Sequence, residues 1–491
     1  MRKHLRFAVK SGIFLLILCL VLLLLTWIFL PKNVFSDSWP NTSTTVNFYR
    51  MEKNSIDVLF LGSSHCVSSF SPQEIYDQYG LRSYNLGTAQ QNILVSYYWL
   101  KEALRYQHPK AVVLDVYFCF QNPRQSSEGS IRYAIDPMRL SPVKMEAIDA
   151  ICEYDKSQTM SYYFPLNRFH GRWESLEEND FSFIERLSHS EMKGFTVLQG
   201  SCGNEAYQPF DIDDSVEPAA MVPLMQEYLD KITSLCRENN IELILVTTPA
   251  SVSSAARYNC INAYAQEHQL AYYDFNESSL YHETGYQFSA DNYDNHHLNY
   301  LGAKKVSDKM GELLTNERHR IPAVYDEQWE MSRDFYETAI QNAELSTITD
   351  LEKYLQAIDR SSYSIFIAVK EDASAYMNDG VANGLQRLGL STDLHGKYGY
   401  SYYAVILPDG ILEDCAGQPL SASGTFCGGR CAYQISSAGL EYGSSCSIII
   451  DHNEYAIQDR GLNIVVYDHV YRKVVDSVCF DTGAPTLDAF R

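Results

Sequence analysis

Residues 56–65 read IDVLFLGSSH. The first six residues form a short run rich in strand formers, which predicts a buried β-strand. The Gly62-Ser63-Ser64 that follows predicts a tight turn at the carboxyl end of that strand. Open parallel α/β sheets carry their chemical groups at this end of their strands. The stretch therefore predicts an α/β sheet with a serine-bearing turn at its functional edge.

Apolar runs and amphipathic segments alternate along the chain after this strand. Alternation of this kind predicts βαβ units and a parallel sheet. The expected strands are 57–61, 82–86, 111–117, 241–247 and 271–275. The expected helices are 72–80, 93–106, 221–239, 254–268 and 301–315. Residues 121–217 interrupt the rhythm with many aromatic and charged positions, and we expect them to be an insertion that covers the site as a lid.

The first 30 residues predict a membrane anchor. Ser11 to Leu30 carry no charge, and the run is long enough to cross a hydrocarbon core of about 30 Å. The positive-inside bias predicts a cytoplasmic amino terminus and an extracellular body, because four basic residues precede the run: Arg2, Lys3, Arg6 and Lys10. A cleaved signal peptide is the alternative, but no small-residue cleavage site follows the run.

A second, smaller domain, α/β or rich in strands, is predicted near the carboxyl end. Its expected strands are 364–370, 402–407, 446–450, 461–468 and 473–480, with a helix at 377–389. The whole chain is expected to divide into a cytoplasmic amino terminus (1–10), a transmembrane anchor (11–30), a tether (31–54), the first domain (55–325), a helical connector (326–360) and the second domain (361–491).

Composition excludes one class of partner. The chain has 491 residues and a formal net charge of -22, so no basic stripe is available to neutralise the phosphates of a nucleic acid. Five of the 12 cysteines lie near the carboxyl end and could form one or two disulfides in an oxidising exterior: Cys415, Cys427, Cys431, Cys446 and Cys479. Zinc is the weaker alternative, because no clear second ligand pair accompanies Cys427 and Cys431.

A second segment supplies partners for the serine of the turn. Asp294 and His297 lie three residues apart, just before the predicted helix at 301–315. This spacing can point both side chains at one pocket, with the carboxylate on one imidazole nitrogen and the other nitrogen facing the serine. His296 and Asp291 are the rival base and acid, but neither keeps the three-residue spacing with its partner. A Gly-Ser-Ser turn alone is weak, because most such serines only cap a helix.

A glycine turn follows the expected strand 82–86. Gly87 would let a backbone N–H approach a developing oxyanion closely. A glycine needed only for the turn is the equally simple interpretation.

Taken together, Gly62-Ser63-Ser64, the Gly87 turn and Asp294-x-x-His297 resemble blocks I, II and V of the SGNH/GDSL hydrolase superfamily, over about residues 55–316. The resemblance implies a flavodoxin-like, three-layer α/β/α fold. It implies that Ser64 is the nucleophile, His297 the general base and Asp294 its orienting acid, with the N–H groups of Ser64 and Gly87 as the oxyanion hole. No metal or cofactor is expected. The block III asparagine of the family has no clear counterpart after the strand at 111–117.

The anchor, the Gly-Ser-Ser turn and the insertion are similar to membrane-anchored, DltD-like proteins of cell-envelope acyl transfer. This likeness implies an O-acyltransferase or O-acetylesterase acting on a cell-envelope polysaccharide, with a membrane-bound acyl-exporting partner. In the insertion, His170, Arg172 and Trp173 are the expected sugar contacts, with ordinary packing as the alternative.

The carboxyl-terminal domain has a resemblance of its own. Residues 363–373, 461–468 and 474–482 look like the ILEI/PANDER-like domain, and the string VDSVCFDT at 475–482 is the most specific part. The resemblance implies glycan binding by analogy, and a structural or protein-contact module is the alternative. A surface glycan-binding or scaffolding protein with a degenerate SGNH domain is therefore the second functional hypothesis.

Overall fold

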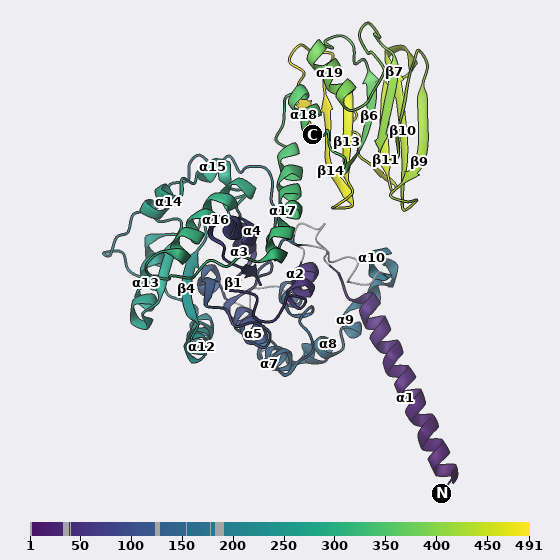
Figure 1. Ribbon diagram of the computed structural model, residues 1–491. Helices are drawn as coiled ribbons and strands as arrows, with labels where there is room; N and C mark the ends of the chain where they lie inside the picture. Colours follow the sequence, from purple (N-terminus) through teal and green to yellow (C-terminus); the bar gives the residue numbers. More distant parts are fainter. Residues whose placement is uncertain are drawn as a thin grey trace. The chain divides into compact units, whose positions relative to one another are not determined.

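The computed structural model describes residues 2–32, 39, 41–122, 128–153, 155–176, 178–181 and 191–491 (Figure 1). The chain forms two compact units, Met1–Tyr336 and Glu337–Arg491. The boundary lies within helix α17 (Glu327–Leu345), in the segment that the sequence predicts as a connector.

The first unit contains a parallel five-stranded sheet in the order β2-β1-β3-β4-β5. The strands are β1 (Val58–Leu61), β2 (Ser83–Asn85), β3 (Ala111–Asp115), β4 (Glu242–Thr247) and β5 (Ala271–Asp274). This order is that of flavodoxin-like doubly wound sheets, in which ligands bind at the carboxyl ends of the strands. The predicted α/β class with a parallel sheet is confirmed. Strand β3 ends at Asp115, two residues before the predicted end.

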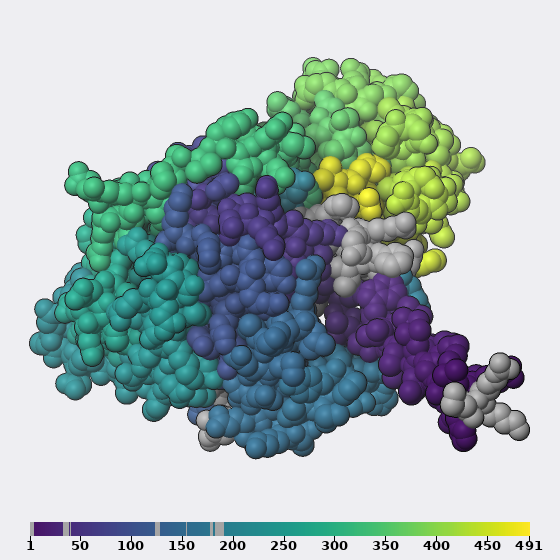
Figure 2. Space-filling model, turned by 60° about the horizontal axis from the view of Figure 1, so that its bottom comes forward, coloured from purple at the N-terminus to yellow at the C-terminus, as the bar shows by residue number. Residues whose placement is uncertain are grey.

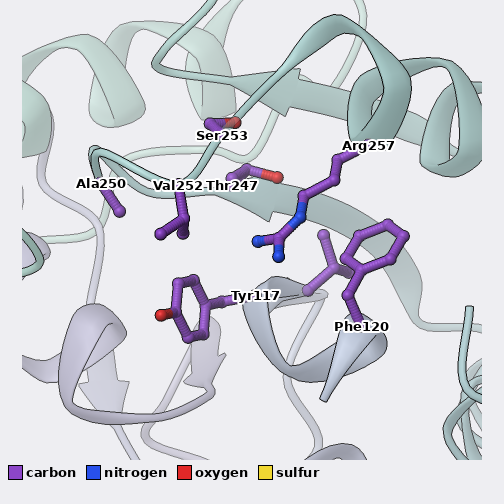
Figure 3. Close-up of a pocket in the computed structure, with 8 residues that line it drawn as sticks. Tyr117, Phe120, Thr247, Ala250, Val252, Ser253 and Arg257 are labelled. Carbon is purple, nitrogen blue, oxygen red and sulfur yellow. The ribbon is translucent and has the colours of Figure 1, made fainter. Parts of the chain in front are cut away.

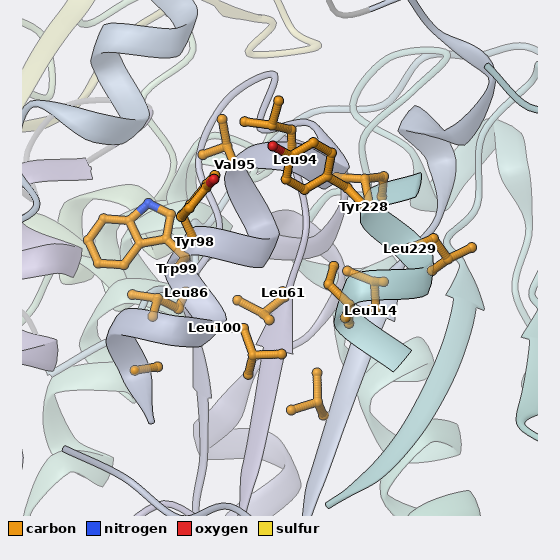
Figure 4. Close-up of a cluster of buried hydrophobic side chains, with 14 of the residues drawn as sticks. Leu61, Leu86, Leu94, Val95, Tyr98, Trp99, Leu100, Leu114, Tyr228 and Leu229 are labelled. Carbon is orange, nitrogen blue, oxygen red and sulfur yellow. The ribbon is translucent and has the colours of Figure 1, made fainter. Parts of the chain in front are cut away.

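Helices cover both faces of this sheet. They are α3 (Ser64–Ser69), α4 (Pro72–Tyr79), α5 (Ile93–Ala103), α12 (Pro223–Glu238), α13 (Ala255–His268), α14 (Ser278–Thr284), α15 (Phe288–Asp291) and α16 (Tyr300–Thr315). All four residues of β1 are buried, and successive side chains of a strand point to opposite faces of the sheet. Both faces must therefore be covered. Leu61 lies in the core under α5 and α12, together with Trp99 and Leu229 (Figure 4). Helix α16 packs against α3 and α4.

The amino-terminal helix α1 (Arg2–Phe29) begins well before the predicted anchor. Its segment His4–Phe29 has a mean hydropathy of 3.0 in the most apolar window, and none of that window is buried. Most apolar side chains of α1 are exposed, and the helix is drawn in purple in Figure 2. A helix of this length and composition near the amino terminus is compatible with a single-pass membrane anchor or a signal sequence.

The predicted tether is wrong for part of its length. Residues 41–48 form helix α2 (Asn41–Phe48), whose side chains are mostly buried in the first unit. Phe48 is fully buried against the ring of Tyr84, and the Tyr84 hydroxyl donates to the carbonyl of Thr44 at 2.7 Å. The Ser, Thr and Asn content suggested a linker, but one aromatic residue on a short helix supplied enough apolar surface to anchor the segment. Residues 33–38 and 40 lie outside the described part of the chain.

The described residues between β3 and α12 form short helices and irregular chain. The helices are η1 (Tyr117–Phe120), α6 (Glu128–Ile135), α7 (Pro142–Ile151), η3 (Lys156–Gln158), α8 (Thr159–Tyr163), α9 (Leu166–Phe169), η4 (His170–Glu174) and α10 (Glu178–Phe181). Residues 191–203 follow as turns and coil. The Asn85 N–H of the edge strand β2 donates to the carbonyl of Lys193 at 2.9 Å, and the Thr196 N–H donates to the carbonyl of Val67 in α3 at 2.9 Å.

The second unit is built mainly from strands. They are β6 (Tyr363–Glu371), β7 (Ser401–Leu407), β8 (Gly410–Ala416), β9 (Leu420–Phe426), β10 (Cys431–Gly439), β11 (Ser445–Ile450), β12 (Asn453–Glu454), β13 (Gly461–Asp468), β14 (Lys473–Phe480) and β15 (Ala489–Phe490). The helices are α18 (Leu351–Ala357), α19 (Asp379–Arg387) and η5 (Leu440–Tyr442). Alternate residues of β6 serve two cores: Ile365 and Ile367 pack with α18 and α19, whereas Phe366 and Ala368 pack with β9 to β11.

The sequence did not predict β8, β9 or β10. Strands β8 and β9 have largely exposed or half-buried side chains, so they lack the apolar runs that identify buried strands. The 12 cysteines are all free thiols in this structure, so the predicted disulfides are not formed here.

Candidate active site

Three side chains form a continuous hydrogen-bonded chain at the carboxyl edge of the first sheet. The Oγ of Ser64, the first residue of α3, lies 2.9 Å from His297 Nε2. His297 Nδ1 lies 3.0 and 2.9 Å from the two carboxylate oxygens of Asp294. Serine, imidazole and carboxylate therefore stand in the order that a nucleophile, a base and an orienting acid require.

Asp294 is held by the turn that precedes α16. Its Oδ1 accepts the backbone N–H groups of His296 and His297 at 2.7 and 2.8 Å. Partial burial raises the pKa of Asp294, but hydrogen bonds from His297 and from these N–H groups outweigh burial and leave the pKa below its usual value. The carboxylate is therefore charged when it faces the imidazole, which favours a proton on Nδ1 and leaves Nε2 free to accept from Ser64.

The nucleophile turn is packed too closely to tolerate a side chain at its glycine. A Cβ on Gly62 would lie 2.7 Å from the Cβ of Asp115 and 2.9 Å from that of Cys66. Ser63 caps α3, because its Oγ accepts the N–H of His65 at 3.3 Å. The turn therefore rests directly on the end of β3.

Asp115 is fully buried and packs against this turn. Burial raises the pKa of Asp115 to about 7, although hydrogen bonds from the Tyr117 N–H at 3.2 Å and from Ser63 Oγ at 3.4 Å act in the opposite direction. The proton is therefore bound more tightly in the folded chain than in the unfolded chain.

Asp115→Asn is expected to stabilise the protein at high pH. The pKa of Asp115 in the folded chain, about 7, is higher than its pKa in the unfolded chain. The free energy of unfolding of the wild type therefore falls as pH rises from about 4 to 7 and stays low above pH 7. An amide cannot ionise. The free energy of unfolding of the variant should therefore exceed that of wild type by up to about 4 kcal/mol at pH 8 and should equal it at pH 4. Denaturant unfolding of both proteins at the two pH values measures the difference.

Asp57→Asn provides a control of opposite sign. Burial raises the pKa of Asp57, but hydrogen bonds from Arg82 and Lys110 dominate and lower it overall. Asp57→Asn should therefore have a lower free energy of unfolding than wild type at pH 8. If Asp115→Asn destabilised the protein equally at pH 4 and pH 8, the buried carboxyl would not be the source of the pH effect.

Gly87 lies directly against the nucleophile turn. A Cβ on Gly87 would lie 2.5 Å from the carbonyl oxygen of Gly62 and 3.0 Å from Val67 Cγ1. Among the described residues, the backbone N–H groups of Ser64 and Gly87 have no hydrogen-bond acceptor. Two free donors beside the nucleophile can serve a developing oxyanion.

Gly87→Ala is expected to reduce ester turnover by about a hundredfold, because the added Cβ must displace one of the two backbone turns and with it an oxyanion donor. Steady-state kinetics with p-nitrophenyl acetate provides the measurement. Gly171→Ala is the matched control, since nothing lies within 4 Å of the Cβ it would add. Wild-type turnover in Gly87→Ala would contradict a role for this close approach.

A short aromatic helix, η1, follows strand β3. Strand β3 ends at Asp115, and Tyr117 begins η1 two residues later. The Tyr117 ring stacks on His65 with centroids 3.9 Å apart. Burial, followed by the charges of His297 and His296, lowers the pKa of His65 well below its usual value, which keeps this imidazole neutral.

Sequence reasoning missed three rings around His297. The ring centroids of His65 and Trp39 lie 5.0 and 5.2 Å from that of His297. The Tyr117 ring stacks on His65. His65 follows the nucleophile directly and could have been noticed. Trp39 and Tyr117 carried no signal, because only the fold brings them near residue 297.

Two cavities adjoin these rings. One, of about 10 Å³ and partly open to solvent, is lined by Trp39, Gly87, Thr88, Tyr133 and Thr196 among others. The second, also of about 10 Å³, lies between η1 and the loop after β4, with Tyr117 in its wall (Figure 3).

The three expected sugar contacts lie together in helix η4 of the insertion. Arg172 donates to the carbonyl of Phe29 at the end of α1 at 2.8 Å and pairs with Asp180 at 2.9 Å. His170 Nδ1 lies 3.1 Å from the carbonyl of Asn167, three residues before it. Trp173 is exposed. The guanidinium therefore holds the end of α1, and none of these contacts among the described residues reaches Ser64.

Comparisons with known proteins add little to this geometry. A protein-family model matches residues 214–319, and its description names no activity. The curated proteins contain no match. Among solved structures, the chain is similar to a candidate acylhydrolase from Bacteroides fragilis, with 12% sequence identity and a TM-score of 0.25, over 55% of this chain and 93% of that one. At this similarity no function transfers, and a functional proposal depends on the site itself.

Proposed function

We propose that the first unit is a serine-dependent acyl-transfer enzyme, an O-acyltransferase or O-acetylesterase that acts on a cell-envelope polysaccharide outside the membrane. The hydrogen-bonded chain Ser64–His297–Asp294 carries the proposal. The SGNH-like blocks over residues 55–316 and the apolar helix α1 support it.

The first half-reaction forms an acyl-enzyme. His297 Nε2 accepts the hydroxyl proton as Ser64 Oγ attacks the acyl carbonyl, and the N–H groups of Ser64 and Gly87 stabilise the resulting oxyanion. Collapse of the tetrahedral intermediate breaks the bond to the donor's leaving group, which takes the proton from His297. The acyl group is then esterified to Ser64.

The second half-reaction repeats these steps with a new nucleophile. A hydroxyl of the acceptor gives its proton to His297 and attacks the ester, and collapse returns that proton to Ser64. A sugar hydroxyl makes the enzyme a transferase, and water makes it an esterase. For a transferase, an acyl-exporting membrane protein is the partner that would supply the donor.

The test uses the full chain in detergent micelles with p-nitrophenyl acetate as the donor and cell-envelope oligosaccharides as acceptors. Mass spectrometry of the peptide that contains Ser64 should detect the acetyl-enzyme. An acetylated oligosaccharide identifies a transferase, and free acetate alone identifies an esterase. Absence of both the acetyl-enzyme and ester turnover would overturn the proposal.

A further inference from the structure

Short helices of the insertion pack against the carboxyl end of α1. Helices α9, η4 and α10 all contact α1. Arg172 of η4 donates to the carbonyl of Phe29 at 2.8 Å, and Lys32, just beyond the helix, donates to the carbonyl of Asp180 in α10 at 2.8 Å. Figure 1 shows α9 and α10 beside this end of α1. The insertion is therefore attached to the end of the apolar helix that leads into the first unit.

The depth of this contact follows from the length of the apolar run. As a helix, the uncharged run 11–30 spans about 30 Å, which matches a hydrocarbon core. Residues 12–24 are exposed, whereas residues 25–30 are half-buried. Six residues cover about 9 Å of helix. In a bilayer that α1 spans, the insertion therefore lies at the level of the outer boundary of the hydrocarbon.

The same helices carry large aromatic side chains that are open to solvent. Phe164, two residues before α9, is 55% exposed, Trp173 in η4 is 66% exposed, and Phe181 in α10 is 56% exposed. Aromatic rings favour the boundary between hydrocarbon and headgroups, and tryptophan does so most strongly. Three such rings on elements that adjoin the end of α1 extend its apolar surface sideways.

The charge of this segment also suits a bilayer surface. Residues 156–173 include Lys156, Arg168 and Arg172 and no acidic residue, although the whole chain has 61 acidic residues. Basic side chains at this level are attracted to anionic headgroups. An aromatic and basic segment in an otherwise acidic chain is typical of a surface that meets lipid.

We propose that a surface formed by Phe164, Trp173 and Phe181, here termed the insertion face, lies in the interfacial layer of the outer leaflet beside α1. The proposal rests on the membrane placement of α1 and is independent of the acyl-transfer chemistry. A single spanning helix lets the body that it carries tilt and turn. A second lipid contact beside the helix fixes which side of the first unit faces the bilayer.

The insertion face also bounds the height of the active site. Trp39, whose ring centroid lies 5.2 Å from that of His297, follows Lys32 by seven residues. Seven residues of chain reach at most about 25 Å. The triad is therefore held close to the membrane surface, where a donor supplied by a membrane-bound partner would emerge.

The experiment reads Trp173 by its fluorescence. The full chain is reconstituted into vesicles of phosphatidylglycerol and phosphatidylcholine, with the phosphatidylcholine brominated near the headgroup end of its acyl chains. The difference in emission between the parent and Trp173→Phe isolates this ring from the other tryptophans. We expect the brominated lipid to reduce that difference about twofold or more and aqueous iodide to leave it nearly unchanged. Quenching by iodide and not by brominated lipid would overturn the insertion face.

Trp27→Phe separates the insertion face from the anchor. Trp27 belongs to α1, so the brominated lipid should quench its emission whenever α1 is in the bilayer. Quenching of Trp27 without quenching of Trp173 would overturn the insertion face alone, and quenching of neither would overturn the anchor with it. Ester turnover is measured separately, so an inactive wild type that shows the expected quenching refutes the enzyme and supports the insertion face.

A matched pair of variants tests whether the contact has a defined face. Phe164→Trp and Leu301→Trp are each made in the Trp173→Phe protein. Leu301 is 45% exposed, but it lies on α16, which packs against α3 and α4. The brominated lipid should quench the ring at position 164 about twofold or more and leave the ring at position 301 to iodide. Equal quenching at both positions would indicate general adsorption and would overturn the proposal.

Discussion

Ser64→Ala is expected to abolish labelling by a serine-reactive fluorophosphonate and to lower ester turnover by about 10⁴-fold or more. The side chain supplies the oxygen that becomes the ester in the acyl-enzyme, and no neighbouring hydroxyl shares its hydrogen bond to His297 among the described residues. Gel fluorescence after labelling and the initial rate with p-nitrophenyl acetate provide the two measurements.

The adjacent histidines supply a matched control for the base. His297→Ala removes the acceptor for the Ser64 proton and should reduce both readouts nearly as far as loss of the serine, because the two groups act as a unit. His296→Ala removes a ring from the same turn without touching Ser64 Oγ. Equal labelling of the His297→Ala and His296→Ala proteins would refute the assignment of the base.

Asp294→Asn is expected to lower kcat by about 10³- to 10⁴-fold while the protein unfolds at nearly the same temperature. An amide cannot stabilise the imidazolium, and its NH₂ group favours the imidazole tautomer that has no free acceptor at Nε2 for Ser64. The hydrogen bonds to the turn are partly retained, because an amide oxygen still accepts the two backbone N–H groups. Kinetics and thermal unfolding are measured on the same preparation.

Asp291→Asn provides the contrast. Asp291 is buried, pairs with Lys305 at 2.7 Å and accepts the N–H of Gln287 at 2.7 Å. Its loss should lower the melting temperature without a specific loss of kcat in the folded protein. A fall in melting temperature for Asp294→Asn as large as that for Asp291→Asn would indicate that Asp294 is a structural residue.

The sequence predicted those parts of the first unit whose structure is set by residues close together in the chain. A run of strand formers and a glycine turn need no distant information, and neither does an Asp-x-x-His whose members are joined by one turn of chain. The strands at the centre of the sheet are buried on both faces, so their sequences are continuously apolar and easy to recognise.

The exposed and irregular parts were predicted poorly for a physical reason. Strands β8 and β9 pair through the backbone, and their half-buried side chains leave only a faint pattern. Arg172 was predicted to contact a sugar because of its residue type. Its partners, Phe29 and Asp180, are set by how the insertion packs on α1. A residue type alone does not reveal which partner satisfies it.

The sequence by itself determined the parallel α/β sheet, the apolar amino-terminal helix and the identity of a serine, a histidine and an aspartate with suitable local spacing. Only the tertiary structure decided that Ser64 and His297, 233 residues apart, lie within hydrogen-bond distance, that Asp115 is buried against their turn, and that Tyr117 stacks on His65 beside a small cavity. The reason is that hydrophobic periodicity is written along a single element, whereas the distance between side chains on different elements depends on how those elements pack.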